Sequence, residues 1–316
     1  NTILENGRKQ AVNSVNHILV QTYWEIGRQI VEYEQKGKEK AEYGSYLLKR
    51  LSEDLTTKYG KGFSIDTLEK IRRFYLLFQN SAPLRRKLSW RHYCLIMRIE
   101  NSLARNFYLI ETEKGSWSTR EMDRQINSML FERLALSKDK QGVIRLAKKG
   151  QIIEKPIDII KDPYILEFLN LEESDKYSET ELEQKIIDNL KRFILEIGKG
   201  FMFVDRQQRI TLDNEHFYID LVFYNRILRC FVIFELKIGK LTHKDLGQLQ
   251  MYVNYYNREI KQDGENQTIG VLLCTDKKET IVKYTLPEDN KHIFASKYKL
   301  YLPSKKVLKE QLKRLL

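Results

Sequence analysis

Two apolar runs, Phe217-Tyr-Ile-Asp-Leu-Val-Phe-Tyr224 and Phe231-Val-Ile-Phe-Glu-Leu-Lys237, decide the fold of this chain. Runs this apolar predict strands at the centre of a sheet, and the turn at Asn225-Arg226 predicts that they pair as a hairpin. Because side chains alternate across a strand, Glu235 and Lys237 point to one face. The hairpin can also bring Asp220 beside Glu235. The two strands therefore predict a cluster of two carboxylates and one ammonium group.

The charges in these strands indicate a cation site. An unpaired carboxylate buried at Asp220 would cost several kcal/mol. Two adjacent carboxylates repel each other unless a proton or a divalent cation lies between them. A small number of oxygen ligands suits Mg²⁺ or Mn²⁺ better than zinc. The alternative for Glu235 and Lys237 is an ordinary ion pair where the strand reaches water.

The helices on either side of the hairpin supply further candidates. In the helix predicted over 180–197, Glu183 continues the apolar stripe and can face a site, although a capping box with Thr180 is the alternative. In the helix that follows the second strand, Gln248 can orient a water molecule or contact a phosphate. An ordinary surface position is the alternative for Gln248, and Gln250 is its rival for the site.

The second half of the chain has the pattern of an α/β domain. Further elements are predicted as strands at Phe201–Asp205, Ile210–Leu212 and Ile269–Cys274, and as helices at 243–258 and Ser304–Leu316. Helix, strand meander, helix and strand in this order predict a small mixed sheet flanked by helices.

The first half has the spacing of helices. They are predicted at 5–35, 43–59, after a cap at Ser64 or Asp66, and near 89–99, 101–111 and 118–134. The glycine turn at Tyr59-Gly-Lys-Gly62 between two helices outlines a helix-turn-helix, although such pairs are common in helical domains. Prolines and polar residues at 150–178 mark a junction. We therefore predict domains at 1–155 and 156–316.

Positive charge is concentrated in the first half. Residues 1–160 carry 29 Lys and Arg against 19 Asp and Glu, whereas residues 161–316 carry 26 against 24. Such a surface attracts phosphate backbones without regard to sequence, although a solvated basic face is the alternative. The candidate nucleic-acid contacts are Lys70, Arg73, Arg85, Arg86 and Arg91.

The pattern of site residues resembles the PD-(D/E)XK nuclease superfamily, and more closely the bacterial YhcG-type proteins. It comprises Glu183, Asp220, Glu235-Leu-Lys237, Gln248 and Tyr252. The flanking stretches also match this family: Leu195-Glu-Ile-Gly-Lys-Gly-Phe201, Phe217–Tyr224, Phe234–Lys237, Gly247-Gln-Leu249, Leu88-Ser-Trp-Arg-His-Tyr93 and Phe107-Tyr108. One departure is Ile219, which stands where the superfamily motif has proline. The resemblance implies a restriction-endonuclease-like domain after a mainly helical, winged-helix-like N-terminal domain.

The resemblance also implies metal-dependent cleavage of DNA. Asp220, Glu235 and the Leu236 carbonyl would hold Mg²⁺ (or Mn²⁺), with Glu183 as a further ligand. Lys237 would steer the attacking hydroxide or offset charge in the transition state. Gln248 would help to position the water or the phosphate. The implied substrate is duplex or branched DNA bound by the N-terminal domain. The alternatives are an inactive nuclease fold that binds DNA or acts as a scaffold, and an RNA nuclease.

Composition sets the remaining expectations. No apolar run approaches the roughly 20 residues needed to span a bilayer, and no export leader is evident, so we expect a cytoplasmic protein without a membrane partner. Cys94, Cys230 and Cys274 lie far apart, which argues against a disulfide framework or a zinc site. A homodimer is expected if the protein cuts both strands of a duplex.

Overall fold

The chain folds into two compact units, Asn1–Ile126 and Asn127–Leu316. The computed structural model describes residues 2–36, 41–79, 87–136, 138–171, 177–302, 304, 306, 308–310 and 312. The division between the two units falls between residues 126 and 127. The sequence places the domain boundary later, between residues 155 and 156, and that boundary stays a prediction. No helix in this described part of the chain combines the length and the apolar character that crossing a membrane requires.

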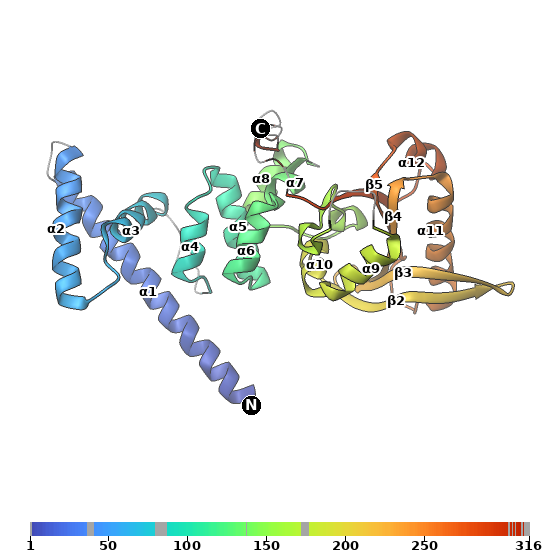
Figure 1. Ribbon diagram of the computed structural model, residues 1–316, viewed down its shortest axis with the longest axis horizontal. Helices are drawn as coiled ribbons and strands as arrows, with labels where there is room; N and C mark the ends of the chain where they lie inside the picture. The colour runs from blue at the N-terminus through green and yellow to red at the C-terminus, as the bar shows by residue number, and fades with distance from the viewer. Residues whose placement is uncertain are drawn as a thin grey trace. The chain divides into compact units, whose positions relative to one another are not determined.

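The N-terminal unit is built from helices, as the sequence predicts (Figure 1). They are α1 (Thr2–Lys36), α2 (Ala41–Tyr59), α3 (Ile65–Leu77), α4 (Trp90–Ile96), α5 (Ser102–Gly115) and α6 (Thr119–Asn127). The predicted cap at Ser64 is confirmed, because its hydroxyl accepts a hydrogen bond from the Thr67 N–H at 3.3 Å. The turn before it uses positive φ at Gly60 and Gly62. The outline of two helices joined by a short glycine turn is therefore present.

α1 and α3 form the centre of this unit. A Cβ at Gly27 would lie 2.5 Å from the Ile71 carbonyl oxygen, so only glycine allows the two helices to approach this closely. Phe74 on α3 then contacts Trp90 and Tyr93 of α4 at ring centroid distances of 5.3 and 4.8 Å. Edge and tilted ring contacts of this kind anchor α4 against α3.

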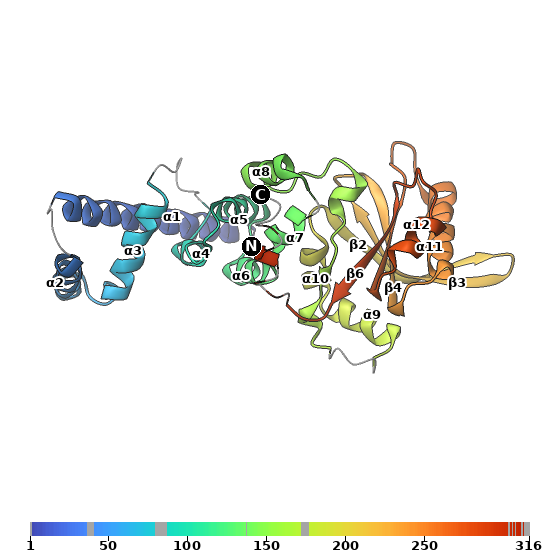
Figure 2. The same cartoon turned by 90° about the horizontal axis from the view of Figure 1, so that it is seen from above.

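The C-terminal unit contains a mixed sheet and its helices (Figure 2). The strands are β1 (Tyr164–Ile165), β2 (Phe201–Leu212), β3 (Glu215–Asn225), β4 (Cys230–Lys240), β5 (Ile269–Asp276) and β6 (Ile293–Lys299). The helices are α7 (Leu130–Leu136), α8 (Lys140–Lys149), α9 (Glu179–Asp188), α10 (Leu190–Ile197), α11 (His243–Tyr255) and α12 (Glu279–Thr285). Short 3₁₀ turns lie at Pro156–Ile159 and Glu167–Leu169, and a π-helical turn at Tyr256–Ile260 extends α11.

The sheet has the order β1-β6-β5-β4-β3-β2. β2, β3 and β4 form an antiparallel meander, whereas β4, β5, β6 and β1 run parallel. α9 and α10 pack on one face through Leu182, Ile186 and Phe193. α11 covers the other face through Leu246, Leu249 and Tyr252. The predicted mixed sheet flanked by helices is confirmed, and β3 and β4 lie inside it.

Several element limits differ from the sequence predictions. β2 is one strand rather than two, because ladder bonds to β3 continue through its exposed polar middle. The helix predicted over 180–197 breaks at Asn189, which has φ −115° and ψ 26°. The helix predicted over 118–134 is divided near Met129, which has a positive φ. The helix predicted over Ser304–Leu316 lies largely outside the described residues.

A buried ion pair joins α7 to α10. The Arg133 Nη1 atom lies 2.8 Å from the Glu196 Oε1 atom, and both side chains are almost fully buried. Arg133 also donates to the carbonyl oxygens of Pro163 and Ser128 at 3.0 and 2.9 Å. The Ile165 N–H donates to Glu196 Oε1 at 3.0 Å. This network fixes α7 on the core of the C-terminal unit.

Candidate active site

β3 and β4 bring the two predicted carboxylates together. The antiparallel register pairs Leu221 with Phe234, which places Asp220 next to Glu235. The Asp220 N–H donates to Glu235 Oε1 at 3.1 Å, and the Leu236 N–H donates to Asp220 Oδ2 at 2.8 Å. Each carboxylate is therefore held by the backbone of the opposite strand.

Glu183 joins this cluster through a residue that the sequence did not single out. The Gln207 amide donates to Glu183 Oε2 at 2.5 Å and to Asp220 Oδ1 at 3.0 Å. Gln207 has a φ of 45°, a conformation that is uncommon for residues other than glycine. The capping box predicted as the alternative for Glu183 is wrong, because Ser178 and Glu181 form the box of α9. Glu183 is buried instead.

Lys237 lies between two acidic side chains. Its Nζ atom is 3.1 Å from Glu179 Oε1 and 3.9 Å from Asp245 Oδ1. Glu179 Oε1 also accepts the Ile238 N–H at 3.1 Å. The ion pair proposed as the alternative for Glu235 and Lys237 is not formed, since the partners of Lys237 come from the first turns of α9 and α11. Glu179 has no local signal that would have identified it from sequence.

The structure separates the two candidate glutamines of α11. The Gln248 amide donates to the Tyr252 hydroxyl at 2.6 Å, and this hydroxyl donates to the Tyr218 carbonyl oxygen at 3.2 Å. Gln250 instead lines a separate hollow with Met251. Burial, and then the negative charge of Glu235, raise the pKa of Tyr252 to about 12. Gln248 is exposed and its side chain is joined to Tyr252, whereas Gln250 lines the other hollow.

The carboxylates have perturbed acidities. The pKa of Asp220 is raised to about 6, mainly by burial and further by the negative charge of Glu183. Burial and then the charge of Asp220 raise the pKa of Glu235 well above its usual range. Burial alone would lower the pKa of Lys237, but its contact with Glu179 outweighs this and raises it. Negative charge is therefore unfavourable at the carboxylate pair and positive charge is favourable close to it.

The oxygen donors of this cluster are chemically suited to a divalent cation. Within the described ranges, no Lys or Arg lies at ion-pairing distance from Asp220 or Glu235. A cation there would relieve the repulsion that raises both pKa values. However, no three His, Cys, Asp or Glu side chains among these residues are already arranged around one point. The amide of Gln207 occupies the space between Glu183 and Asp220, so a cation that binds Glu183 must displace it.

The predicted nucleic-acid contacts lie in the N-terminal unit. Arg73 lies on α3 and Arg91 on α4, and both side chains are exposed. Lys70 is also exposed and pairs with Asp66 on the same helix. Arg85 and Arg86 lie outside the described residues.

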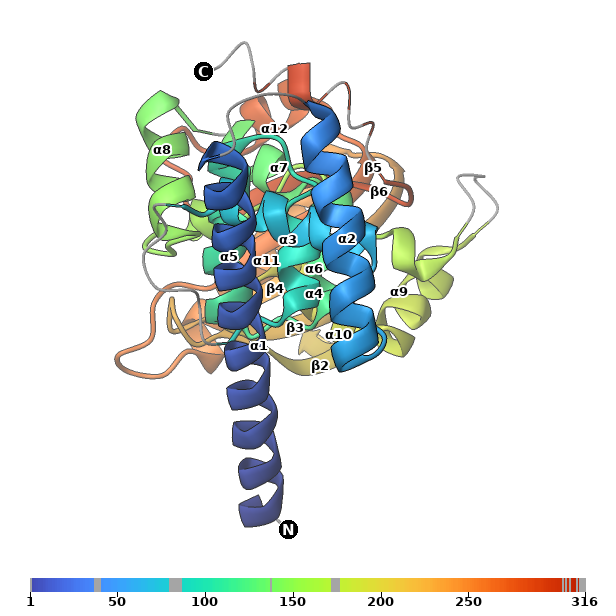
Figure 3. The same cartoon turned by 90° about the vertical axis from the view of Figure 1, so that its left-hand side faces the viewer.

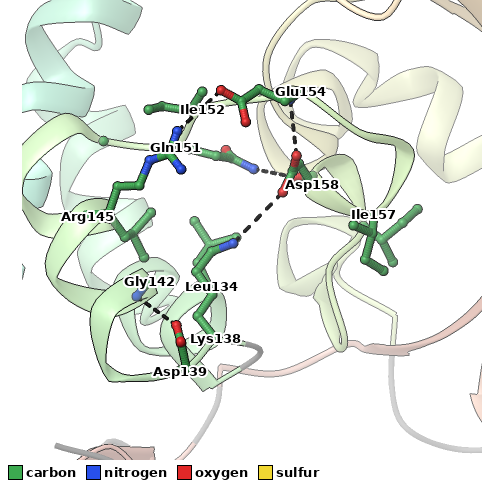
Figure 4. A pocket seen from close by; sticks show the side chains of 13 residues that line it. Leu134, Lys138, Asp139, Gly142, Arg145, Gln151, Ile152, Glu154, Ile157 and Asp158 are labelled. Carbon is green, nitrogen blue, oxygen red and sulfur yellow. Dashed lines mark hydrogen bonds and ion pairs between the residues drawn. The ribbon is translucent and has the colours of Figure 1, made fainter.

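A second hollow of the C-terminal unit lies away from these carboxylates (Figure 4). It has a volume of about 330 Å³ and is lined by residues of α7, α8 and the segment that follows. Its charged groups are already paired, with Lys138 4.0 Å from Asp158 and Arg145 3.3 Å from Glu154. None of the predicted site residues lines it.

Comparisons with known proteins agree with the fold. Residues 157–313 match the family model of the YhcG PDDEXK nuclease domain, and residues 1–133 match that of the DUF1016 N-terminal domain. The protein named "Putative nuclease YhcG" of Escherichia coli (strain K12) is 37% identical, over 99% of this chain and 91% of its own length.

Solved structures show weaker likenesses. A repair endonuclease from Pyrococcus abyssi is 22% identical, with a TM-score of 0.30 over 42% of this chain and 50% of that one. EndoMS in complex with double-stranded DNA is 16% identical, with a TM-score of 0.29 over 43% of this chain and 51% of that one. The family assignment rests instead on the near full-length relative and the two family models. On these grounds, the chain belongs to the YhcG family of nucleases with a PDDEXK domain.

Proposed function

We propose that this protein is a metal-dependent endonuclease that hydrolyses phosphodiester bonds of DNA. The observation that carries this proposal is the contact between Asp220 and Glu235 on paired strands, with Lys237 two residues further along β4. PDDEXK nucleases generally use divalent metals. We propose Mg²⁺, with Mn²⁺ as a substitute, because the donors are oxygens.

The residues of the site have distinct tasks. Asp220, Glu235 and the Leu236 carbonyl would hold the cation, and Glu183 would join them if the Gln207 amide were displaced. A divalent cation supplies charge neutralisation at the phosphate and makes the attacking water more acidic. Lys237, held by Glu179 and Asp245, places a fixed positive charge beside the position where negative charge develops. Gln248 orients the water or the phosphate from α11.

The basic N-terminal unit supplies DNA affinity in this proposal. Lys70, Arg73 and Arg91 contact phosphates, and we also assign Arg85 and Arg86 to this surface on sequence grounds. Contacts of this kind release counterions, so DNA affinity falls as salt concentration rises. Duplex or branched DNA is the proposed substrate.

The decisive experiment is cleavage of supercoiled plasmid DNA in Mg²⁺, Mn²⁺ or EDTA. Wild type is compared with Glu235→Ala and with Glu215→Ala, a control at an exposed glutamate on β3. We expect metal-dependent nicking that is lost in Glu235→Ala and kept in Glu215→Ala. If the protein binds DNA without cleaving it, the function is that of a DNA-binding or scaffold protein with a nuclease fold. Cleavage of single-stranded RNA alone would make it an RNA nuclease.

A further inference from the structure

The first half of α1 carries an exposed apolar face. Leu4 is 70%, Val15 65% and Ile18 61% exposed. The opposite side of the same helix packs on the N-terminal unit, where Val20 and Val31 are buried. Isolated helices have marginal stability in water, and their apolar faces are normally covered. This face is therefore a candidate contact surface.

The exposed face continues into a groove. Beyond residue 24, the same side of α1 meets α2, and the two helices enclose a hollow of about 440 Å³. Ile26 and Tyr33 line it from α1, and Leu47, Leu51 and Leu55 line it from α2. Figure 3 shows α2 beside one part of α1, while the N-terminal part of α1 continues past it. Face and groove form one surface along the helix.

The spacing along this surface is that of a coiled-coil seam. Intervals of four and three residues alternate without interruption through Leu4, Arg8, Ala11, Val15, Ile18, Thr22, Glu25 and Gln29. Such a repeat positions one row of side chains against a partner helix. A second row, at Val12, Leu19 and Ile26, is spaced by seven residues and widens the apolar face.

The seam is complementary to itself in the antiparallel direction. If a two-fold axis passes between residues 16 and 17, Val15 faces Ile18 of the second copy, and small Ala11 faces small Thr22. Arg8 then faces Glu25, which also pairs with Arg28 of its own helix at 2.5 Å. A parallel pair would instead place Arg8 against Arg8 and Glu25 against Glu25. Like charges in a seam are unfavourable, so the charges select the antiparallel direction.

The groove lies at the correct distance from this axis. With a rise of 1.5 Å per residue, Leu4 lies about 19 Å from the axis on one side, and Gln29 lies about 19 Å from it on the other. Leu4 of one copy therefore reaches the groove of the other, which Gln29 helps to line. We propose that α1 pairs with α1 of a second copy as an antiparallel coiled coil, so that the protein is a homodimer through its N-terminal unit.

The first test is the molar mass of the full chain, measured by light scattering after size exclusion over a dilution series. We expect a dimer for wild type and a monomer for Val15→Glu combined with Ile18→Glu, because opposed glutamates at the axis raise the dissociation constant by at least about 100-fold. Ile3→Glu is the control, since Ile3 is 87% exposed on the same helix but off the seam. It should remain a dimer. Circular dichroism checks that every variant keeps its helix content.

The second test measures the direction of pairing. Copies with Leu4→Cys are mixed with copies with Gln29→Cys under mild oxidation, with wild type as background. We expect cross-linked dimers only in the mixture, because the antiparallel pair keeps the two thiols introduced at position 4 far apart. Cross-linking of Leu4→Cys with itself would overturn the antiparallel direction. A monomeric wild type, or a dimer that survives the double glutamate variant, would overturn the proposal.

Discussion

Glu196 and Glu235 are both buried in the C-terminal unit, yet their surroundings differ in sign. Glu196 faces the Arg133 guanidinium at 2.8 Å and accepts a backbone N–H. Glu235 faces a second carboxylate, Asp220, through one backbone hydrogen bond. The first acid has its charge compensated within the fold. The second has its charge opposed, which raises its pKa.

This difference separates a group that stabilises the fold from the pair to which we assign the cation. Removing one partner of a compensated buried pair is strongly destabilising, because the other charge stays buried without a counterion. An opposed pair destabilises the metal-free protein, and binding of a proton or a cation relieves this destabilisation. The burial of an acidic residue alone therefore does not identify a site, and the sign of its neighbours is needed as well.

The largest effect is expected at the compensated pair. Arg133→Met leaves Glu196 buried without its cation and should lower the free energy of unfolding by about 3–5 kcal/mol in urea titrations. Arg145→Met is the matched control, because Arg145 and its partner Glu154 are both more than half exposed, and its effect should stay within about 0.5 kcal/mol. Arg133→Met combined with Glu196→Gln should be less unstable than Arg133→Met alone. Equal effects at the two arginines would remove the distinction.

At the opposed pair of Asp220 and Glu235, we expect removal of a charge to raise the free energy of unfolding rather than to lower it. The pKa of Asp220 is about 6 in the folded chain and lower when unfolded, so its contribution to stability is present at acid pH and is lost as pH rises through 6. Asp220→Asn should therefore stabilise the metal-free protein at pH 8 by about 1–3 kcal/mol. The difference from wild type should vanish near pH 4. Urea titrations in EDTA measure it, and the exposed Asp213→Asn should not reproduce it.

Adding Mg²⁺ tests the same difference between the compensated pair and the opposed pair. Mg²⁺ at about ten times its dissociation constant should stabilise wild type by about 1–2 kcal/mol, seen as a rise in Tm at pH 8. Asp220→Asn should lose this gain, whereas Arg133→Met should keep it if the protein remains folded. A gain of equal size in Asp220→Asn would place the cation elsewhere.

The smallest effect concerns the two glutamines of α11. Gln248→Ala should reduce the rate of DNA cleavage about 10-fold, or about 1.4 kcal/mol, because it removes the amide linked to Tyr252 beside the carboxylates. Gln250→Ala, on the far side of the same helix, should cleave at the wild-type rate. The opposite ranking would assign the site glutamine to Gln250.

Much of the fold could be predicted because its signals are local. The hairpin of β3 and β4 joins two apolar runs across a short turn, so pairing and alternation follow from adjacent residues. The ends of helices and strands were less predictable where hydrogen bonds, rather than the residue types of the segment, determine where an element ends. The polar middle of β2 continues as a strand because its pairing with β3 resumes after a bulge between Phe203 and Asp205. α9 ends at Asn189, whose side-chain amide donates to the Lys185 carbonyl oxygen at 3.1 Å.

The sequence by itself determined that Asp220, Glu235 and Lys237 gather on paired strands, since a period of two and one turn suffice for that. Only the tertiary structure decided what surrounds them. Gln207 reaches Glu183 across 24 residues of chain, and Arg133 reaches Glu196 across 63. Such contacts depend on how helices dock on the sheet, and docking is set by the shape of the whole core rather than by any local pattern.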